Sequence, residues 1–151
     1  MFAYKESTVA QIPVTEITNS TLIKPQGRIF YAGNAASFSI DYCTMYGWGG
    51  SKAMLELGDK NTLGMSLAIK NTILANGGSN RKAHNANAAA NLSLTIEKVY
   101  GTNDMTFHST LGDVTKYDKP STEVFENPEE GNFKIIDALF PSSIGDPRWT
   151  E

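Results

Sequence analysis

Residues 37–48 read SFSIDYCTMYGW, and the alternation in this stretch governs the fold that we expect. Large side chains occupy most even positions, and small or polar ones occupy most odd positions. The even set is Phe38, Ile40, Tyr42, Thr44, Tyr46 and Trp48. Because successive side chains of a strand point to opposite faces, the stretch predicts a central β-strand with one aromatic face.

The composition also favours strands. Only 19% of the 151 residues are charged, which is below the roughly 25% that is usual in soluble domains. The remaining polarity comes largely from Asn, Thr, Ser and Gly, which prefer strands and turns to helices. The single cysteine, Cys43, cannot form an internal disulfide, and a chain of this length can bury a core without one.

Further strands are expected on both sides of the central strand. Residues 28–32 pair with the central strand as a hairpin, residues 53–57 pair with 63–69, and residues 92–100 pair with 105–111. A helix over 61–76 is the alternative for the middle of the chain. No repeat of solenoid or propeller period is evident in the sequence. The predicted fold is therefore all-β or β-rich, with antiparallel hairpins forming a sandwich or barrel.

Three regions are expected along the chain. Residues 1–26 form an N-terminal arm, which Pro13 interrupts, and it packs on its own domain or on a neighbouring subunit. Residues 27–112 form the β-rich core domain. Residues 113–151 form an acidic extended tail with one short helix from Phe133 to Phe140, ended by Pro141. The net charge is +3 over residues 1–90 and −6 over 91–151, which favours solubility or complementarity between copies.

Catalytic and metal-binding motifs are not evident. His84, His108 and Cys43 lie in three separate segments without zinc-site spacing, and neither a nucleophile motif nor a phosphate-binding loop is found. We expect His84 to be solvated and His108 to be half-exposed on a strand. The sequence therefore predicts a protein that is not an enzyme and has no catalytic residues, metal site or cofactor.

Six residues are candidates for binding: Tyr42, Tyr46, Trp48, Arg81, Lys82 and His84. The three aromatic rings are able to stack on bases while the basic side chains contact phosphates, as in single-strand binders of the OB type. The same aromatic face can instead be core, and no basic stripe accompanies it. The last three residues belong to the segment 76–91, NGGSNRKAHNANAAAN, which predicts an exposed loop that a partner orders.

The leading functional hypothesis is a non-enzymatic, self-assembling structural protein, such as a viral coat, decoration or tail component. Apolar residues in both extended termini suit a homo-oligomer held by terminal arms. The first alternative is a single-stranded nucleic-acid-binding module of OB type. The second is a small binder that captures a ligand or protein with the 76–91 loop. Neither a signal peptide nor a membrane span is recognisable, so we expect a cytoplasmic or virion location and no membrane partner.

Overall fold

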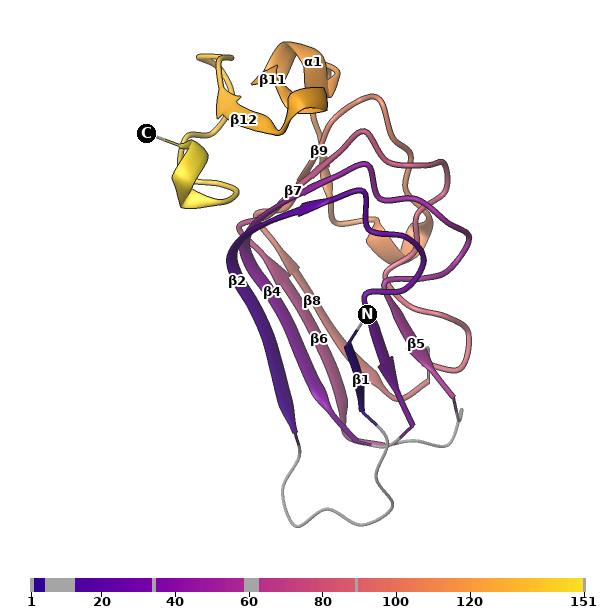
Figure 1. Cartoon of the computed structure of the whole chain (residues 1–151). Helices are drawn as coiled ribbons and strands as arrows, with labels where there is room; N and C mark the ends of the chain where they lie inside the picture. Colours follow the sequence, from indigo (N-terminus) through magenta and orange to yellow (C-terminus); the bar gives the residue numbers. More distant parts are fainter. Residues whose placement is uncertain (1, 5–12, 34, 59–62, 89, 151) are drawn as a thin grey trace.

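The strands wind into a β-solenoid, in which nearly all pairs are parallel (Figure 1). The computed structural model describes residues 2–4, 13–33, 35–58, 63–88 and 90–150. One sheet contains β2 (Val14–Ile23), β4 (Ser37–Tyr46), β6 (Met65–Lys70), β7 (Ile73–Ala75), β8 (Leu92–Glu97), β9 (Tyr100–Gly101) and β10 (Thr115–Lys116). A second sheet contains β1 (Phe2–Tyr4), β3 (Phe30–Ala32) and β5 (Leu55–Leu57).

Each coil of the solenoid places its strands directly on those of the previous coil. One interior ladder contains Ile17, Ile40, Ile69 and Ile96, which are paired in register across β2, β4, β6 and β8. These positions are 23, 29 and 27 residues apart in the chain. The chain therefore does contain a structural repeat, contrary to the sequence analysis. The repeat is hidden in the sequence because the loops between strands differ in length.

The β-rich class is confirmed, but the antiparallel sandwich or barrel is wrong. The predicted strands overlap β3, β4, β5, β6 and β8, yet none of these five strands forms a hairpin with the next. β4 instead pairs in parallel with β2 on one side and with β6 and β7 on the other. The reason is that alternation with a period of two identifies a strand without indicating its partner. Residues 109–111 form a short 3₁₀ helix, η1 (Ser109–Leu111), and not part of a returning strand.

A corner divides the central strand. Tyr42 has a φ angle of 49°, in the left-handed region. The equivalent residues of the neighbouring coils, Asn19, Asn71 and Lys98, have the same conformation. The corner shifts the alternation, so the buried residues before it are even-numbered, such as Ile40, and those after it include the odd-numbered Met45. The single aromatic face that we expected over residues 37–48 therefore does not exist.

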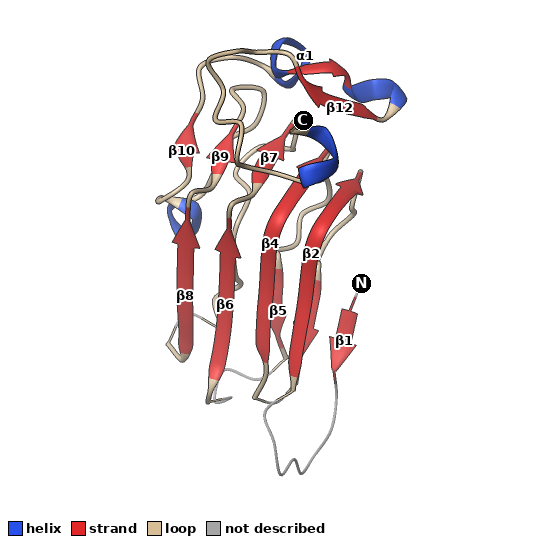
Figure 2. Ribbon diagram, turned by 90° about the vertical axis from the view of Figure 1, so that its left-hand side faces the viewer, coloured by secondary structure: helices blue, strands red, loops and turns tan. Residues whose placement is uncertain are grey.

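The C-terminal segment covers the outer face of the sheet near β7 and β9 (Figure 2). It contains α1 (Ser121–Val124), β11 (Phe125–Asn127), η2 (Pro128–Glu130), β12 (Asn132–Ile135) and η3 (Pro147–Trp149). Its apolar side chains form a second core cluster with residues from the sheet: Tyr46, Ile73, Ala75, Val124, Phe125, Phe133, Phe140 and Ile144. The outer face of this part of the sheet is therefore buried.

The short helix is not where the sequence analysis placed it. The described helix of α type, α1, precedes the predicted range, and the first residues of that range belong to β12. β12 pairs antiparallel with β11, and Phe133 is fully buried between Phe125 and Tyr46. A helix as short as the predicted one is only marginally stable without a surface to pack on. In this protein the first part of the predicted helix forms a strand instead, because it pairs with β11.

Residues 14–23, expected to belong to an arm, form β2 and pair with β4 over most of their length. The division of the chain into arm, core and tail stays a prediction. The helices that the structure describes are all too short to span a lipid bilayer.

Candidate functional site

A surface hollow of about 450 Å³ lies on the side of the solenoid formed by the loops. Three successive coils line it, with residues Ser51, Lys52, Ala53, Glu56, Lys82, His84, Asn85, Ala86, His108 and Thr110. The two histidines of the chain, which are 24 positions apart, thus lie in the lining of one hollow. The stacking of coils brings together side chains that the sequence separates.

Backbone hydrogen bonds between the coils set the positions of these side chains. Met54 N–H donates to the Lys82 carbonyl at 2.9 Å, and His108 N–H donates to the Arg81 carbonyl at 2.8 Å. Ala83 is fully buried, and its N–H donates to the Thr110 hydroxyl at 3.1 Å. The buried Ala83 anchors this segment, while its neighbours Lys82 and His84 line the hollow.

The two imidazole rings differ in their hydrogen-bond partners. His84 Nδ1 lies 2.9 Å from the Asn85 carbonyl, which can only accept, so Nδ1 carries the hydrogen. His108 Nδ1 accepts a hydrogen bond from the backbone N–H of Thr110 at 3.2 Å, so a neutral His108 ring carries its hydrogen on Nε2. In the neutral state, therefore, Nε2 of His84 is an acceptor and Nε2 of His108 is a donor. These tautomers follow from the partners of each ring.

Positive charge dominates the lining. Glu56, the acidic residue of the hollow, already lies 3.2 Å from Arg28 and 3.9 Å from Lys52. Lys82 is exposed and makes no ion pair with another described residue. A smaller hollow of about 230 Å³ lies next to the first one, since the two share Ser51, Lys52 and Lys82. The other residues that line the smaller hollow are Ser79, Asn80 and Arg81. We refer to the two hollows together as the basic groove, defined by Lys52, Arg81, Lys82, His84 and His108.

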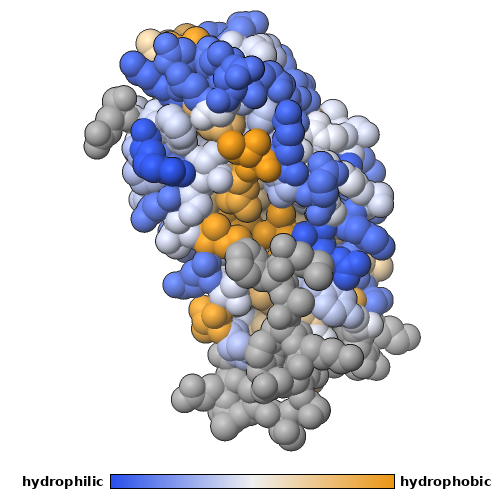
Figure 3. All heavy atoms as spheres, in the orientation of Figure 1, coloured by the Kyte–Doolittle hydropathy of each residue, from blue (hydrophilic) through white to orange (hydrophobic). Residues whose placement is uncertain are grey.

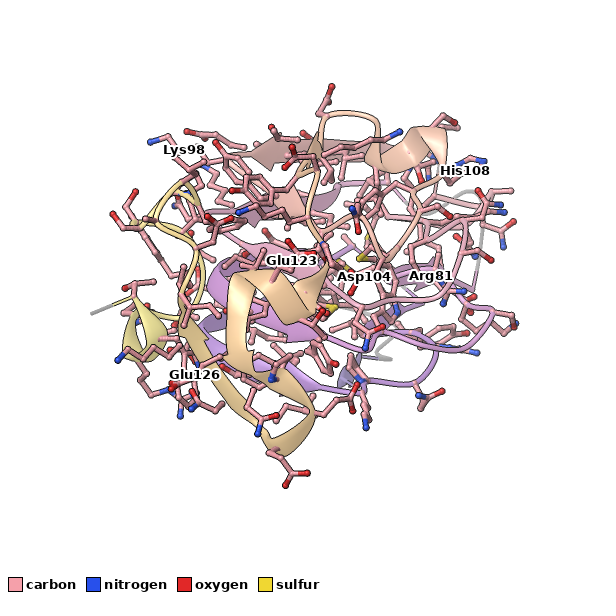
Figure 4. All side chains as sticks on the ribbon, turned by 90° about the horizontal axis from the view of Figure 1, so that it is seen from above. Arg81, Lys98, Asp104, His108, Glu123 and Glu126 are labelled. Carbon is pink, nitrogen blue, oxygen red and sulfur yellow. The ribbon has the colours of Figure 1, made fainter. Side chains whose placement is uncertain are left out.

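Arg81 is held in place at one end of the basic groove. Its guanidinium donates to the carbonyls of Gly50 and Ser79 and lies 5.7 Å from the centre of the Trp48 ring. These contacts restrict the side chain, so little further conformational entropy is lost when it binds a ligand. Figure 4 shows Arg81 and His108 on the same side of the molecule, away from Lys98.

Two of the predicted aromatic binding residues are buried. Tyr46 and Trp48 are 0% and 1% exposed, so neither ring is available for stacking on a base. The Tyr46 hydroxyl donates to Glu129 at 2.6 Å, and burial together with this carboxylate raises the pKa of Tyr46. Trp48 Nε1 donates to the Gly27 carbonyl at 3.0 Å. Tyr42 is 40% exposed, but it lies at the corner of the central strand and does not line the groove.

The basic predicted residues, in contrast, do come together. Arg81, Lys82 and His84 all belong to the basic groove. Lys52 and His108 also line the groove, although neither was among the six predicted binding residues. One signal for Lys52 was present: Gly-Gly-Ser occurs at 49–51, directly before Lys52, and again at 77–79, where Asn80 separates it from Arg81 and Lys82. The 28-residue spacing of these segments is close to the length of one coil.

Metal coordination is not supported by the groove. Within the described ranges, no three His, Cys, Asp or Glu side chains are grouped closely enough to hold a metal ion. The groups that the groove does offer are ammonium, guanidinium, imidazole, hydroxyl and amide, which suit the binding of carboxylate, sulfate or phosphate.

Comparison with known proteins places most of the chain in a family. Residues 38–149 match the model of a family described as Domain of unknown function (DUF5123). Curated proteins and solved structures gave no match.

Proposed function

The chain belongs to the family described as Domain of unknown function (DUF5123), and we propose that it is a non-enzymatic binding module that captures an anionic ligand in the basic groove. This proposal corresponds to the expected binder that uses the 76–91 loop, because Arg81, Lys82 and His84 belong to that loop. It adds residues from the coils on both sides, Lys52 and His108.

The observation that supports the proposal is the concentration of cationic groups in a protein of net charge −3. Lys52, Arg81 and Lys82 line the same hollow, and Glu56, the carboxylate of the groove lining, is shared between Arg28 and Lys52. Like charges that lie close together repel one another, and a bound anion removes that repulsion. A cluster of this kind is therefore better suited to ligand capture than to stability of the unliganded fold.

The size and shape of the groove restrict the ligand. A hollow of about 450 Å³ lies in the range of small-molecule sites. The groove also crosses successive coils, and stacked repeats form extended surfaces that suit extended ligands. Ser51 and Thr110 add hydroxyl groups to the lining, which can bind the hydroxyls of a ligand. A segment of an acidic polymer, with carboxylate, sulfate or phosphate groups spaced along it, fits these features.

Isothermal titration calorimetry with four probes tests this proposal. Polygalacturonate supplies carboxylates, heparin oligosaccharide supplies sulfates, oligo-dT supplies phosphates, and dextran is the neutral control. We expect at least one anionic probe to bind, dextran not to bind, and the affinity to fall as salt is added. The double variant Lys52→Ala/Lys82→Ala is expected to lose roughly tenfold in affinity.

The matched control is Lys134→Ala, which removes the same charge from an exposed position on β12. It should bind like the unaltered protein. The proposal fails if all anionic probes behave like dextran, or if the double variant and Lys134→Ala bind equally well. Preference for oligo-dT would favour nucleic-acid binding, although not through an OB fold, because the sheets form a parallel solenoid.

The other functional expectations stay predictions. They are the self-assembling structural protein of viral coat, decoration or tail type, the absence of enzymatic activity, and the cytoplasmic or virion location.

A further inference from the structure

Within the described residues, no strand pairs with the outer edge of the first coil of the solenoid. Among the described strands, β2 pairs on one side only, with β4, and Figure 2 shows it at the border of its sheet. Interior residues of this coil, such as Ile17 and Leu22, are only half-buried, whereas Ile40 and Met45 one coil further in are fully buried. Figure 3 shows apolar residues gathered in the middle of this end of the solenoid.

β2 has few of the features that protect exposed edge strands from association. It is ten residues long, and its only charged side chain is Glu16. Natural edge strands are usually short, or they carry lysine, proline or a bulge. Two large apolar side chains on its outer face are also exposed: Val14 at 64% and Ile23 at 53%.

The pairing of β2 with β4 shows which backbone groups of β2 point away from β4. The Pro13 carbonyl accepts from Ser37 N–H at 2.9 Å, and Lys24 N–H donates to the Tyr46 carbonyl at 2.6 Å, so both positions point toward β4. The direction of these groups alternates along a strand. The N–H and C=O groups that point away from β4 therefore belong to Val14, Glu16, Thr18, Thr21 and Ile23. The Thr18 carbonyl already accepts from the Ser20 hydroxyl at 2.6 Å, so the pairing positions are Val14, Glu16, Thr21 and Ile23.

This free edge is complementary to itself. The corner at Asn19 divides β2 into segments of similar length, 14–18 and 20–23. A two-fold axis at the corner places each segment beside the other segment of a second copy, running antiparallel. Residues with free backbone groups then face one another: Val14 opposite Ile23, and Glu16 opposite Thr21. The exposed apolar side chains at the two ends of β2 meet across the interface on the outer face.

The interior side chains match as well. In the same register, Ile17 lies opposite Ser20 of the second copy, and Thr15 lies opposite Leu22. All four belong to the inner side of the solenoid, since they continue the ladders of Phe38, Ile40, Cys43 and Met45. We propose that β2 pairs antiparallel with β2 of a second copy of this chain, which joins two solenoids end to end as a two-fold dimer. This pairing is independent of the basic groove.

Light scattering after size-exclusion chromatography tests the pairing on the unaltered chain. The expected mass is twice the 16.4 kDa of one chain. A single-chain mass at high micromolar concentration would overturn the proposal. A binding partner of the free β2 edge would then have to be a different polypeptide. Hydrogen exchange gives a second measurement without any mutation. Amides of Glu16 and Thr21, which point away from β4, should exchange slowly in the dimer and faster on dilution.

Charge substitutions test the register itself. Val14→Lys/Ile23→Lys places like charges opposite each other across the axis and should give the single-chain mass. Val14→Glu/Ile23→Lys places opposite charges there and should restore the double mass. The two positions lie at opposite ends of a ten-residue strand, so they cannot pair within one chain. Equal masses for the two double variants would overturn the register. If a variant does not fold, the mass of the unaltered chain still shows whether the protein forms a dimer.

Discussion

Asp104 and Ser121 are joined by two hydrogen bonds, which tie the last coils of the solenoid to the start of α1. Oδ2 of Asp104 accepts from the backbone N–H of Ser121 at 2.9 Å and from its hydroxyl at 2.5 Å. Oδ1 accepts from the backbone N–H of Asn76 at 3.1 Å and from the Thr102 hydroxyl. One carboxylate thus connects the ends of β7 and β9 with the C-terminal segment.

The variant Asp104→Asn should destabilise the protein most clearly at neutral pH. Burial acts to raise the pKa of Asp104, but hydrogen bonds from Ser121, Thr102 and the backbone outweigh burial and leave this pKa below its usual value. The ionised group therefore stabilises the fold above the pKa of the unfolded state, and this contribution is lost as the pH falls through the acidic range. We expect a loss of about 1–3 kcal/mol in the free energy of unfolding at pH 7.

Urea unfolding at neutral and acidic pH measures this effect. The gap between Asp104→Asn and the unaltered protein should narrow in acid. The control is Asp113→Asn, which neutralises an exposed carboxyl group. The assignment to Asp104 would be wrong if both variants had the same stability at pH 7.

Substitution within the isoleucine ladder should cost more in the middle than at the end. Ile69 is fully buried, whereas Ile96, in the last strand of the ladder, is only half-buried. Ile69→Ala leaves a cavity and should cost about 2–5 kcal/mol of the free energy of unfolding. Ile96→Ala should cost clearly less. Equal losses in chemical denaturation would contradict the described stacking of β6 between β4 and β8.

A methyl group at Gly50 should disturb the contact between the first two coils. The φ angle of Gly50 is +75°, and a Cβ there would approach the backbone nitrogen of Gly27 to 2.6 Å. Because both the conformation and the close backbone contact disfavour a side chain, Gly50→Ala should lower the melting temperature by several degrees. Gly33→Ala is the control, since a Cβ at Gly33 meets no atom of the described residues within 4 Å. Calorimetry that shows equal shifts for the two variants would argue against this contact.

Cys43 should react with thiol reagents only when the protein unfolds. Its side chain is fully buried, and burial raises the pKa of the thiol to about 11. Because the folded-state pKa lies above the unfolded one, the thiol stabilises the fold at neutral pH, and this contribution is lost as the pH rises toward 11. Labelling with a coloured disulfide reagent should be slow in buffer and fast in urea. Equally fast labelling in both conditions would show that the site opens readily.

The strand content and the residue types of the groove could be predicted from local sequence. Alternation over residues 65–70 and 92–97 correctly indicated strands, because side-chain direction along a strand depends only on neighbouring residues. The segment 76–91 contains Arg81, Lys82 and His84, but it is hydrogen-bonded into the coils with Ala83 and Ala88 buried, and it is not the exposed loop that we expected. The strands and the basic residues involve short stretches of chain, so each is visible without knowledge of the fold.

Three features depended on the tertiary structure: the direction of the strands, the burial of the aromatic residues and the placement of both histidines in one hollow. Tyr46 is buried because Glu129 and the rest of the C-terminal segment pack on it, and Glu129 lies 83 residues away in the chain. His84 and His108 line the same hollow only because successive coils stack. The physical reason is that burial and pairing arise from contacts between distant segments, whereas the sequence pattern records the period of one strand at a time.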